Sequence, residues 1–513
     1  MTASAVRGYY TADEVRAAEA ELFTRVPEGM PMRRAAFGLA DVVARELRAR
    51  TGGVAGRSVT LLVGSGDNGG DALWAGSFLR RRGVAVRAIL FAPERVHTAG
   101  LAALQRAGGR ICAAPATVEE LEEDPGAILR VRVSTHVPQP VRDLLGAPDL
   151  VVDGIVGISG RGPLRPVAAE VVAGVRSPII AADLPSGVDP DTGAVSGPAV
   201  RAEVTVAFGA HKPVHALAAA HCGRIELVPI GLQLPSANLL AMDPRSVGAA
   251  WPVPGAADDK YTQGVTGVCA GSGTYPGAAV LCTGGAIAAT SGMVRYTGTA
   301  APQVLAHYPE VIAAESISAT GRVQSWVFGP GAGTDPAALD RLAEILATDL
   351  PVVVDADGLT LLAKNPGLVT GRTAPTVLTP HAGEFARLTG SDPAPDRVAA
   401  VRKLADSWQV TVLLKGRATL IATPGAPVIV NEAGASWAAT AGSGDVLSGI
   451  LAALLSTNLP PFLAAPAAAR AHALAANLAA HESTPAGAPI SATPLLSHVR
   501  QAIATLRELA APN

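Results

Sequence analysis

Short apolar runs alternate with longer amphipathic stretches along most of the chain. In residues 58–231 the apolar runs are SVTLLVG, VAVRAIL, DLVVDGIVG, PIIAADLPSG, VTVAFGA and RIELVPIG. Continuous apolar strands separated by helices are typical of a parallel sheet covered on both faces. The pattern therefore predicts a three-layer αβα unit. Before it, helical spacing in residues 11–50 predicts two helices, the second with Met32, Ala36, Leu39, Val43 and Leu47 on one face.

A second α/β series follows in the other half of the chain. Its strand-like runs are TGVCAGSG, VQSWVFGPGAG, PVVVDADGL, PTVLTPHAGEF, VTVLLKG, TLIAT and PVIVNEAG, before Ala-rich helices from residue 446. Between the two series the periodicity is lost and Pro, Gly and Ala accumulate, as in a linker. We therefore expect a first domain at 1–235, a linker at 236–254 and a second domain at 255–513. A length of 513 residues suits two domains.

Composition narrows the function. The chain is 49% hydrophobic and 16% charged with a formal net charge of -2, so no overall field favours nucleic acid or an anionic membrane. No uninterrupted apolar run reaches the roughly 18 residues of a membrane span, and the first residues lack an apolar signal core. The cysteines lack CxxC or Cys/His spacing, which favours reduced thiols in the cytoplasm; they are Cys112, Cys222, Cys269 and Cys282.

A glycine-rich loop follows the first strand of the first series. Gly64, Gly66 and Gly69 match G-x-G-x-x-G between this strand and a helix predicted at 72–82. The acidic residue that a dinucleotide site needs at the end of the second strand is missing, which disfavours an NAD(P) dehydrogenase. Asp67 and Asp71 would repel a pyrophosphate, so the loop indicates a metal ion or a sugar hydroxyl.

Two further strands of this series end in carboxylates. Ligands of an open parallel sheet collect outside the carboxyl ends of its strands, so we expect Asn68, Asp153, Asp183 and Ser186 to converge. Oxygen ligands without Cys or His favour a hard cation. Either aspartate, taken alone, would also suit a helix cap or a turn.

The motifs GSGDNGGD, DGIVGISGRGP, DLPSGVDPDTG and TVAFGAHKP make residues 10–230 resemble the NAD(P)H-hydrate epimerases. The resemblance implies a Rossmann-like fold and a potassium ion held by Asn68, Asp153 and Ser186. Asp67 departs from the family, which usually has Asn there, and its charge either strengthens cation binding or hinders an anion. The implied substrate contacts are Asp67, Asn68, Gly69, Gly70, Asp71, Gly157, Ile158, Ser159, Gly160, Arg161, Gly162, Pro163 and Asp183.

The implied reaction equilibrates the R and S forms of hydrated NADH and NADPH (NADHX and NADPHX) at C6 of the nicotinamide ring. Asp183 is our candidate catalytic group, because a carboxylate can promote ring opening and reclosure by acid–base catalysis. Lys212 either binds phosphate or is a solvated lysine.

The second glycine loop, Ala441-Gly-Ser-Gly-Asp445, precedes an apolar helix predicted at 446–455. Backbone N–H groups at such a helix start can hold a phosphoryl group while Asp445 takes a proton from a hydroxyl. This pattern indicates a small-molecule kinase, although Asp445 would also suit a simple cap. The P-loop motif is absent from the sequence. Asp355 or Glu384 could order magnesium.

The ordered motifs GSGTYPGAA, GPGAG, DADGL, LTPHAGEF, LLKGRAT, N-x-x-G and AGSGDVLSGI make residues 255–505 resemble the ribokinase-like, ADP-dependent NAD(P)H-hydrate dehydratases. The resemblance implies that the C6 hydroxyl of the S hydrate is phosphorylated and phosphate is then lost, with ADP as donor and AMP as product. Mg²⁺ is expected near the phosphates. The implied substrate contacts are Ala278, Gly331, Gly333, His381 and the catalytic Asp445, and the implied nucleotide contacts are Lys415, Gly416, Arg417, Ala418, Thr419 and Gly444.

Together the halves predict a bifunctional repair enzyme, because an epimerase supplies the epimer that the dehydratase accepts. The alternative is a ribokinase-like small-molecule kinase whose first domain only senses nucleotides, since a fold does not fix a substrate. Families of this kind often form homo-oligomers, but the sequence shows no patch for one.

Overall fold

The computed structural model describes residues 6–118, 139–290, 292–432 and 434–511. The chain forms two α/β units, as predicted. The N-terminal unit is Tyr9–Ala237, and the C-terminal unit is Asn238–Asn513 together with Met1–Gly8.

The N-terminal unit is built on a seven-stranded parallel sheet. The strand order is β4-β3-β2-β5-β6-β7-β8, so the direction of winding reverses between β2 and β5. The strands are β2 (Ser58–Val63), β3 (Ala85–Leu90), β4 (Arg110–Ala113), β5 (Leu150–Gly154), β6 (Ile179–Ala182), β7 (Val204–Phe208) and β8 (Arg224–Val228). The helices are α1 (Ala12–Phe23), α2 (Met30–Thr51), α3 (Asp67–Arg81), α4 (Thr98–Arg106), α5 (Gln139–Leu145), α6 (Pro166–Ala173), α7 (Pro213–Leu217) and α8 (Ala219–Cys222).

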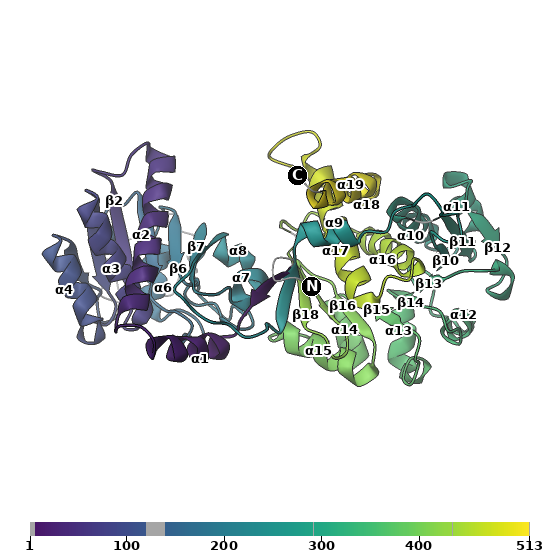
Figure 1. Cartoon of the computed structure of the whole chain (residues 1–513), viewed down its shortest axis with the longest axis horizontal. Helices are drawn as coiled ribbons and strands as arrows, with labels where there is room; N and C mark the ends of the chain where they lie inside the picture. Colours follow the sequence, from purple (N-terminus) through teal and green to yellow (C-terminus); the bar gives the residue numbers. More distant parts are fainter. Residues whose placement is uncertain (1–5, 119–138, 291, 433, 512–513) are drawn as a thin grey trace. The chain divides into compact units, whose positions relative to one another are not determined.

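Helices cover both faces of this sheet (Figure 1). Leu61 belongs to the core that contains α2 and α3, whereas its neighbour Leu62 belongs to a second core with α5 and α6. Successive strand residues point to opposite faces, so both faces must be apolar. This explains the continuous apolar runs, and the predicted three-layer arrangement is confirmed.

Helix α3 begins at Asp67, five residues before the predicted start at residue 72. Its first turn is therefore the acidic loop itself. Gly69 allows this, because a Cβ there would lie 2.3 Å from the Gly64 carbonyl oxygen. Glycine is a poor helix former, so a pattern of apolar positions cannot show a helix that starts with DNGGD.

The C-terminal unit has an eleven-stranded sheet in the order β1-β9-β18-β17-β16-β15-β14-β13-β10-β11-β12. β17 pairs antiparallel with both neighbours, and β10 to β16 pair in parallel. The strands are β1 (Val6–Tyr9), β9 (Leu239–Met242), β10 (Val265–Cys269), β11 (Met293–Thr297), β12 (Ile312–Ala314), β13 (Ser325–Phe328), β14 (Val352–Val354), β15 (Thr376–Leu378), β16 (Thr411–Leu414), β17 (Ala418–Ala422) and β18 (Val428–Glu432).

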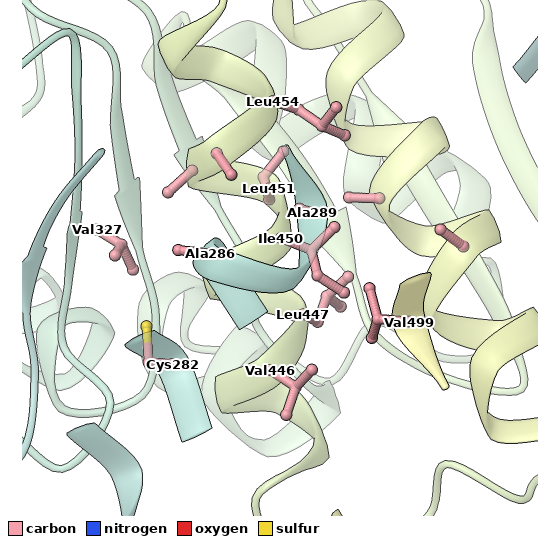
Figure 2. Packing of buried hydrophobic residues seen from close by; sticks show 14 of the residues in the cluster. Cys282, Ala286, Ala289, Val327, Val446, Leu447, Ile450, Leu451, Leu454 and Val499 are labelled. Carbon is pink, nitrogen blue, oxygen red and sulfur yellow. The ribbon is translucent and has the colours of Figure 1, made fainter. Parts of the chain in front are cut away.

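One face of this sheet is covered by the helices that follow β18 and by α10, and α12 to α15 lie on the other side (Figure 1). Figure 2 shows the core between α10 and α16, where Cys282 and Ala286 lie beside Val446 and Ile450. The helices are α9 (Pro244–Ala250), α10 (Pro276–Ala289), α11 (Ala301–His307), α12 (Pro336–Leu346), α13 (Asp357–Lys364), α14 (Ala382–Thr389), α15 (Arg397–Trp408), α16 (Ser443–Ser456), α17 (Pro461–His481), α18 (Ala492–Ser497) and α19 (Val499–Ala510).

The expected linker at 236–254 is wrong in its central part, which forms β9 and α9. β9 pairs in parallel with β18, and α9 packs on α19. A Cβ at Gly248 of α9 would lie 1.9 Å from the Leu506 carbonyl oxygen. The N-terminal strand β1 also joins this sheet, next to β9, and not the first unit. Four-residue edge strands are held by backbone hydrogen bonds, so their side chains carry little pattern.

All four cysteines are free, as predicted. Burial raises the pKa of the Cys269 thiol to about 12, which makes it an inert core residue. No described helix combines the length and the hydropathy needed to cross a membrane.

Candidate active sites

A cavity of about 1140 Å³ opens at the carboxyl ends of β2 and β5 in the N-terminal unit. This is the point where the strand order reverses, and open parallel sheets bind ligands there. Gly69, Gly70, Asp153 and Ser186 are not among the residues of its wall. The predicted residues that line it are Asp67, Asn68, Asp71, Gly157, Ile158, Ser159, Gly160, Arg161, Gly162, Pro163 and Asp183.

The backbones at these strand ends touch. Gly64 donates its N–H to the Gly154 carbonyl over 3.0 Å. A Cβ at Gly64 would lie 1.8 Å from the Ile155 carbonyl oxygen, so only glycine fits. The glycine of the motif therefore serves the close approach of two strand ends.

Asp183 follows β6 directly and has a left-handed backbone, with φ at 65°. Its Oδ1 accepts hydrogen bonds from the Lys212 ammonium and, over 3.0 Å, from the Phe208 N–H. Among the described residues no donor reaches its second oxygen, Oδ2. The residue is 6% exposed and lines the cavity. The structure thus supports a carboxylate with one oxygen fixed and one available to a ligand.

The environment of Lys212 differs from both interpretations made from the sequence. It is only 1% exposed, and its Nζ also donates to the Phe208 carbonyl oxygen over 2.8 Å. It is therefore neither a solvated lysine nor a free phosphate ligand. The Nε2 atom of His215 lies 2.9 Å from the Asp183 carbonyl oxygen. Burial, together with the Lys212 charge, lowers the pKa of His215 to about 3.

Asp153 and Ser186 form one hydrogen-bonded group behind the cavity wall. Ser186 donates its Oγ–H to Asp153 Oδ1 over 2.7 Å and its N–H to Oδ2 over 2.8 Å, and Ile155 donates its N–H to Oδ1 over 3.1 Å. Burial nevertheless raises the pKa of Asp153 to about 6. The carboxyl group therefore has protein donors but no basic partner.

Asn68 reaches the same place from the first turn of α3. Its Nδ2 donates to the carbonyl oxygens of Val156, at 3.1 Å, and Ala182, at 2.8 Å. Because the nitrogen is engaged, Oδ1 is left for another partner. Val156 also approaches Ser186 Oγ, with its N–H at 2.9 Å, so the three predicted cation ligands are indeed neighbours.

Two further carboxyl groups of this cavity have raised pKa values. Burial, followed by the charge of Asp183, raises the pKa of Glu19 to about 7. The same two causes raise the pKa of Asp71 well above its usual value, and Asp71 Oδ1 is buried without a hydrogen-bond partner. The sequence analysis missed Glu19. The feature of the sequence that could have identified Glu19 is its position at the edge of the apolar face of α1, beside the buried Ala18.

In the C-terminal unit the strand order reverses between β10 and β13. Gly331 follows β13 with φ at 59°, and a Cβ there would lie 2.9 Å from the Ala278 Cβ at the start of α10. Gly333 donates its N–H to Asp357 Oδ2 over 2.9 Å. The three predicted contacts Ala278, Gly331 and Gly333 therefore meet at the switch point, where a ligand is expected.

Asp445 lies in the first turn of α16, which begins at Ser443 and not at the predicted residue 446. Gly442 precedes it in a left-handed conformation, with φ at 84°. Burial and then the charge of Asp355 raise the pKa of Asp445 to about 7. No described residue forms a hydrogen bond with its carboxyl group, so the simple cap is not what the structure shows.

Lys415 organises the carboxylates beside Asp445. Its Nζ lies 2.7 Å from Asp355 Oδ1 and 3.5 Å from Glu384 Oε2. Burial lowers the pKa of Lys415, but these two charges outweigh it and the pKa is raised. Asp355 Oδ2 accepts the Ser448 hydroxyl over 2.7 Å. Both oxygens of Asp355 therefore already accept a hydrogen bond from the protein.

His381 caps α14, with its Nδ1 accepting the N–H groups of Gly383 and Glu384 at 3.0 and 3.3 Å. In return Glu384 Oε2 accepts the His381 N–H over 2.8 Å, so Glu384 is also engaged. The Nε2 atom of His381 lies 3.5 Å from Glu384 Oε1. The His381 ring also lines a cavity of about 550 Å³.

This second cavity collects most of the predicted nucleotide contacts. Lys415, Gly416, Arg417, Thr419 and Gly444 line it, but Ala418 does not, because its side chain is buried within β17. His472 of α17, which the sequence analysis missed, also lines it. Its Nε2 lies 2.8 Å from the Ser443 carbonyl oxygen, and burial lowers its pKa to about 4.

Comparison with known proteins relates each unit to a family. Residues 29–214 match the family described as YjeF-related protein N-terminus, and residues 266–497 match the family described as NAD(P)H-hydrate dehydratase. A Bacillus subtilis ADP/ATP-dependent NAD(P)H-hydrate dehydratase, co-crystallised with ATP and Mg²⁺, is 25% identical and covers 51% of this chain and 97% of its own, with a TM-score of 0.45.

Relatives of full length carry both units. A Mycobacterium leprae protein is 58% identical over 504 residues, covering 98% of this chain and all of its own length. A Corynebacterium glutamicum protein is 35% identical, covering 92% of this chain and 94% of its own. Both are named bifunctional NAD(P)H-hydrate repair enzyme. With both family models matched and similarity along the whole chain, the protein belongs to the family of bifunctional NAD(P)H-hydrate repair enzymes.

Proposed function

We propose that the N-terminal unit epimerises the R and S hydrates of NADH and NADPH, and that the C-terminal unit dehydrates the S form. The phosphoryl donor is ADP, which yields AMP and phosphate, and the product is the intact reduced cofactor. The observation that carries this assignment is that each unit has a carboxylate beside a cavity, with an oxygen that no described residue engages. These are Asp183, which lines the N-terminal cavity, and Asp445, next to the cavity-lining Gly444 in the first turn of α16.

In the N-terminal unit Asp183 is the proposed catalytic residue. Its Oδ2 takes the proton of the C6 hydroxyl, the N1–C6 bond breaks, and C6 becomes an aldehyde. Closure of the ring on the other face of the aldehyde gives the second epimer. Lys212 and Phe208 hold Oδ1, so the carboxylate is already oriented before substrate binds.

Potassium is the proposed cation of this unit, with Asn68, Asp153 and Ser186 as its ligands. They offer only oxygen atoms and one carboxylate, a donor set that suits a hard cation of low charge. Asn68, Asp153 and Ser186 would hold the ion, which would supply positive charge next to the buried Asp153. The substrate contacts proposed for this unit are the predicted residues that line the cavity.

In the C-terminal unit Asp445 takes the proton of the C6 hydroxyl as that oxygen attacks the phosphoryl group. The N–H groups at the start of α16 stabilise the charge on the transferred group. Phosphate is a far better leaving group than hydroxide, so it leaves C6 readily, and loss of a proton from C5 then restores the C5–C6 double bond. The nucleotide occupies the cavity lined by Lys415, Arg417 and Thr419.

Magnesium is expected with the phosphates of the nucleotide. Asp355 and Glu384, which already accept hydrogen bonds from protein donors, remain the residues proposed to order it. The substrates are small molecules of the cytoplasm, where we place the enzyme.

The test uses a mixture of R and S NADPH hydrates with the enzyme, ADP, Mg²⁺ and K⁺, and follows the absorbance of the reduced cofactor. Rapid conversion of both epimers is the expected result. If only the S form reacts rapidly, the N-terminal unit is not an epimerase. If neither form reacts while nucleotide is consumed with another alcohol, the protein is a kinase of a different substrate.

A further inference from the structure

Glu19 is held at the edge of the N-terminal cavity by the anchoring of α1. The helix begins with Ala12, whose N–H donates to Asp191 Oδ1 over 2.7 Å. Three residues on one face, Val15, Ala18 and Leu22, are buried against the unit. Glu19 follows this face and lines the cavity, so a fixed backbone presents it to the ligand space.

The surroundings of Glu19 are acidic, and its carboxyl group has no hydrogen-bond partner among the described residues. It shares the cavity wall with Asp67, Asp71 and Asp183. The charges that act on it are those of Asp183 and Asp67, which are repulsive, and those of Lys212 and Arg16, which are attractive. None of the residues that the structure describes donates a hydrogen bond to its carboxyl group or accepts one from it.

Ring opening needs an acid as well as a base, because the N1 nitrogen must receive a proton when its bond to C6 breaks. Asp183 provides the base. Lys212 is poorly suited as the acid, since its ammonium is committed to Asp183 and to the Phe208 carbonyl. His215 is turned towards the Asp183 backbone and is not part of the cavity wall. The acid must therefore come from another group on the wall.

We propose that Glu19 is the second catalytic residue of the epimerisation and protonates N1 of the nicotinamide ring; this inference rests on the proposed epimerase function. In the forward step Asp183 takes the hydroxyl proton, the C6–N1 electron pair goes to N1, and Glu19 gives N1 its proton. After rotation about the C5–C6 bond, N1 attacks the other face of the aldehyde. Its proton returns to Glu19, and the oxygen regains the proton held by Asp183. No redox partner is needed.

The charge state of Glu19 agrees with this role. Burial, then the repulsion of Asp183 and Asp67, raises its pKa to about 7, while Lys212 and Arg16 oppose the shift. A carboxyl group that donates a proton must be protonated, so epimerisation should slow as the pH rises through about 7. A general acid whose pKa is close to the working pH is the most effective kind.

The experiment measures interconversion of purified R-NADPH hydrate in the full-length enzyme without ADP, with the epimers separated by chromatography. Glu19→Gln should lower kcat by roughly 100-fold or more and change KM by less than about threefold. It should also abolish the alkaline decline. Glu19→Asp should retain that decline with part of the activity. Glu21→Gln, on the same helix but exposed and paired with Arg25, is the matched control and should behave as the wild type.

Each other outcome is decisive. A Glu19→Gln enzyme that keeps wild-type kcat or an unchanged alkaline decline overturns the proposal but leaves the epimerase function intact. Loss of the alkaline decline in Asp71→Asn, with Glu19→Gln unaffected, gives the role to Asp71. A wild-type enzyme that does not accelerate interconversion refutes the epimerase function and this inference together. Hydrogen exchange of β6 amides shows whether the Glu19→Gln unit is folded.

Discussion

Removal of the Lys212 ammonium is the sharpest test of how the N-terminal site is built. Lys212→Met keeps most of the side-chain volume but deletes the charge that faces Asp183. Asp183 is 6% exposed in the wild type, and its carboxylate would then be supported mainly by the Phe208 N–H. Breaking a buried ion pair by removing one partner costs about 3–5 kcal/mol.

Neutralising the other partner should recover much of this loss. Asp183→Asn is the suitable second change, because Asn tolerates the left-handed backbone of Asp183 better than most residues and can still accept the Phe208 N–H. The double variant carries no charge at either of these two positions. We expect it to lie within about 2 kcal/mol of the wild type, since replacing both charges is far less costly than stranding one.

Native-state hydrogen exchange with mass spectrometry measures these differences in each unit separately. The protection of amides in β6 and β7 should fall by about 10²–10⁴ in Lys212→Met, which is the stated free energy at 1.4 kcal/mol per tenfold change. Amides of β14 in the C-terminal unit serve as the internal control and should not change. A loss below about 1 kcal/mol in Lys212→Met, or a double variant less stable than the single one, would refute the reasoning.

The other predictions concern catalysis, backbone approach and the cation. Asp445→Asn should abolish dehydration and spare epimerisation. The pKa of Asp445 is raised to about 7, and this base must be ionised to act. The kcat/KM of the wild type on the S hydrate should therefore rise with pH up to about 7 and then stay constant. Gly64→Ala should destabilise the N-terminal unit by about 2–4 kcal/mol in the same exchange assay, through a clash and a lost hydrogen bond. Gly66→Ala, with nothing within 4 Å of its Cβ, should cost less than about 1 kcal/mol. Exchanging K⁺ for tetramethylammonium should slow epimerisation and lower the thermal stability of the N-terminal unit. In Asp153→Asn the exchange of salts should change neither the rate nor the stability. Equal stability of the wild type in the two salts would contradict the potassium site.

Several features of the fold follow from local pattern. Both faces of the parallel strands are buried, so each strand had to be a continuous apolar run, and the two series could be recognised without any tertiary information. The carboxyl ends of parallel strands lie at one edge, which is why Asn68, Asp153 and Asp183 could be expected together. Asp445 could be placed at a helix start because the glycine loop and the apolar run that follows it are also local features of the sequence.

Other features were fixed by contacts that no local pattern contains. β1 and β9 are too short to show periodicity, and only the open edge of the second sheet gives them a place. Helix α3 can start at Asp67 because Gly154, at the end of β5, leaves room for its first turn: a Cβ there would lie 3.0 Å from the Asn68 carbonyl oxygen. These decisions depend on neighbours far away in the sequence.

The sequence by itself determined two α/β units, their motifs and the strand ends where ligands gather. Tertiary structure alone decided which charged groups of the two sites meet. Lys212 meets Asp183 across 29 residues, and Asp355 is held by Lys415 and Ser448 across 60 and 93 residues. Burial and ion pairing set the pKa of a carboxyl group, and both depend on partners that only the folded chain brings together. This is why Glu19, an ordinary helix residue in the sequence, becomes a proton donor in the structure we propose.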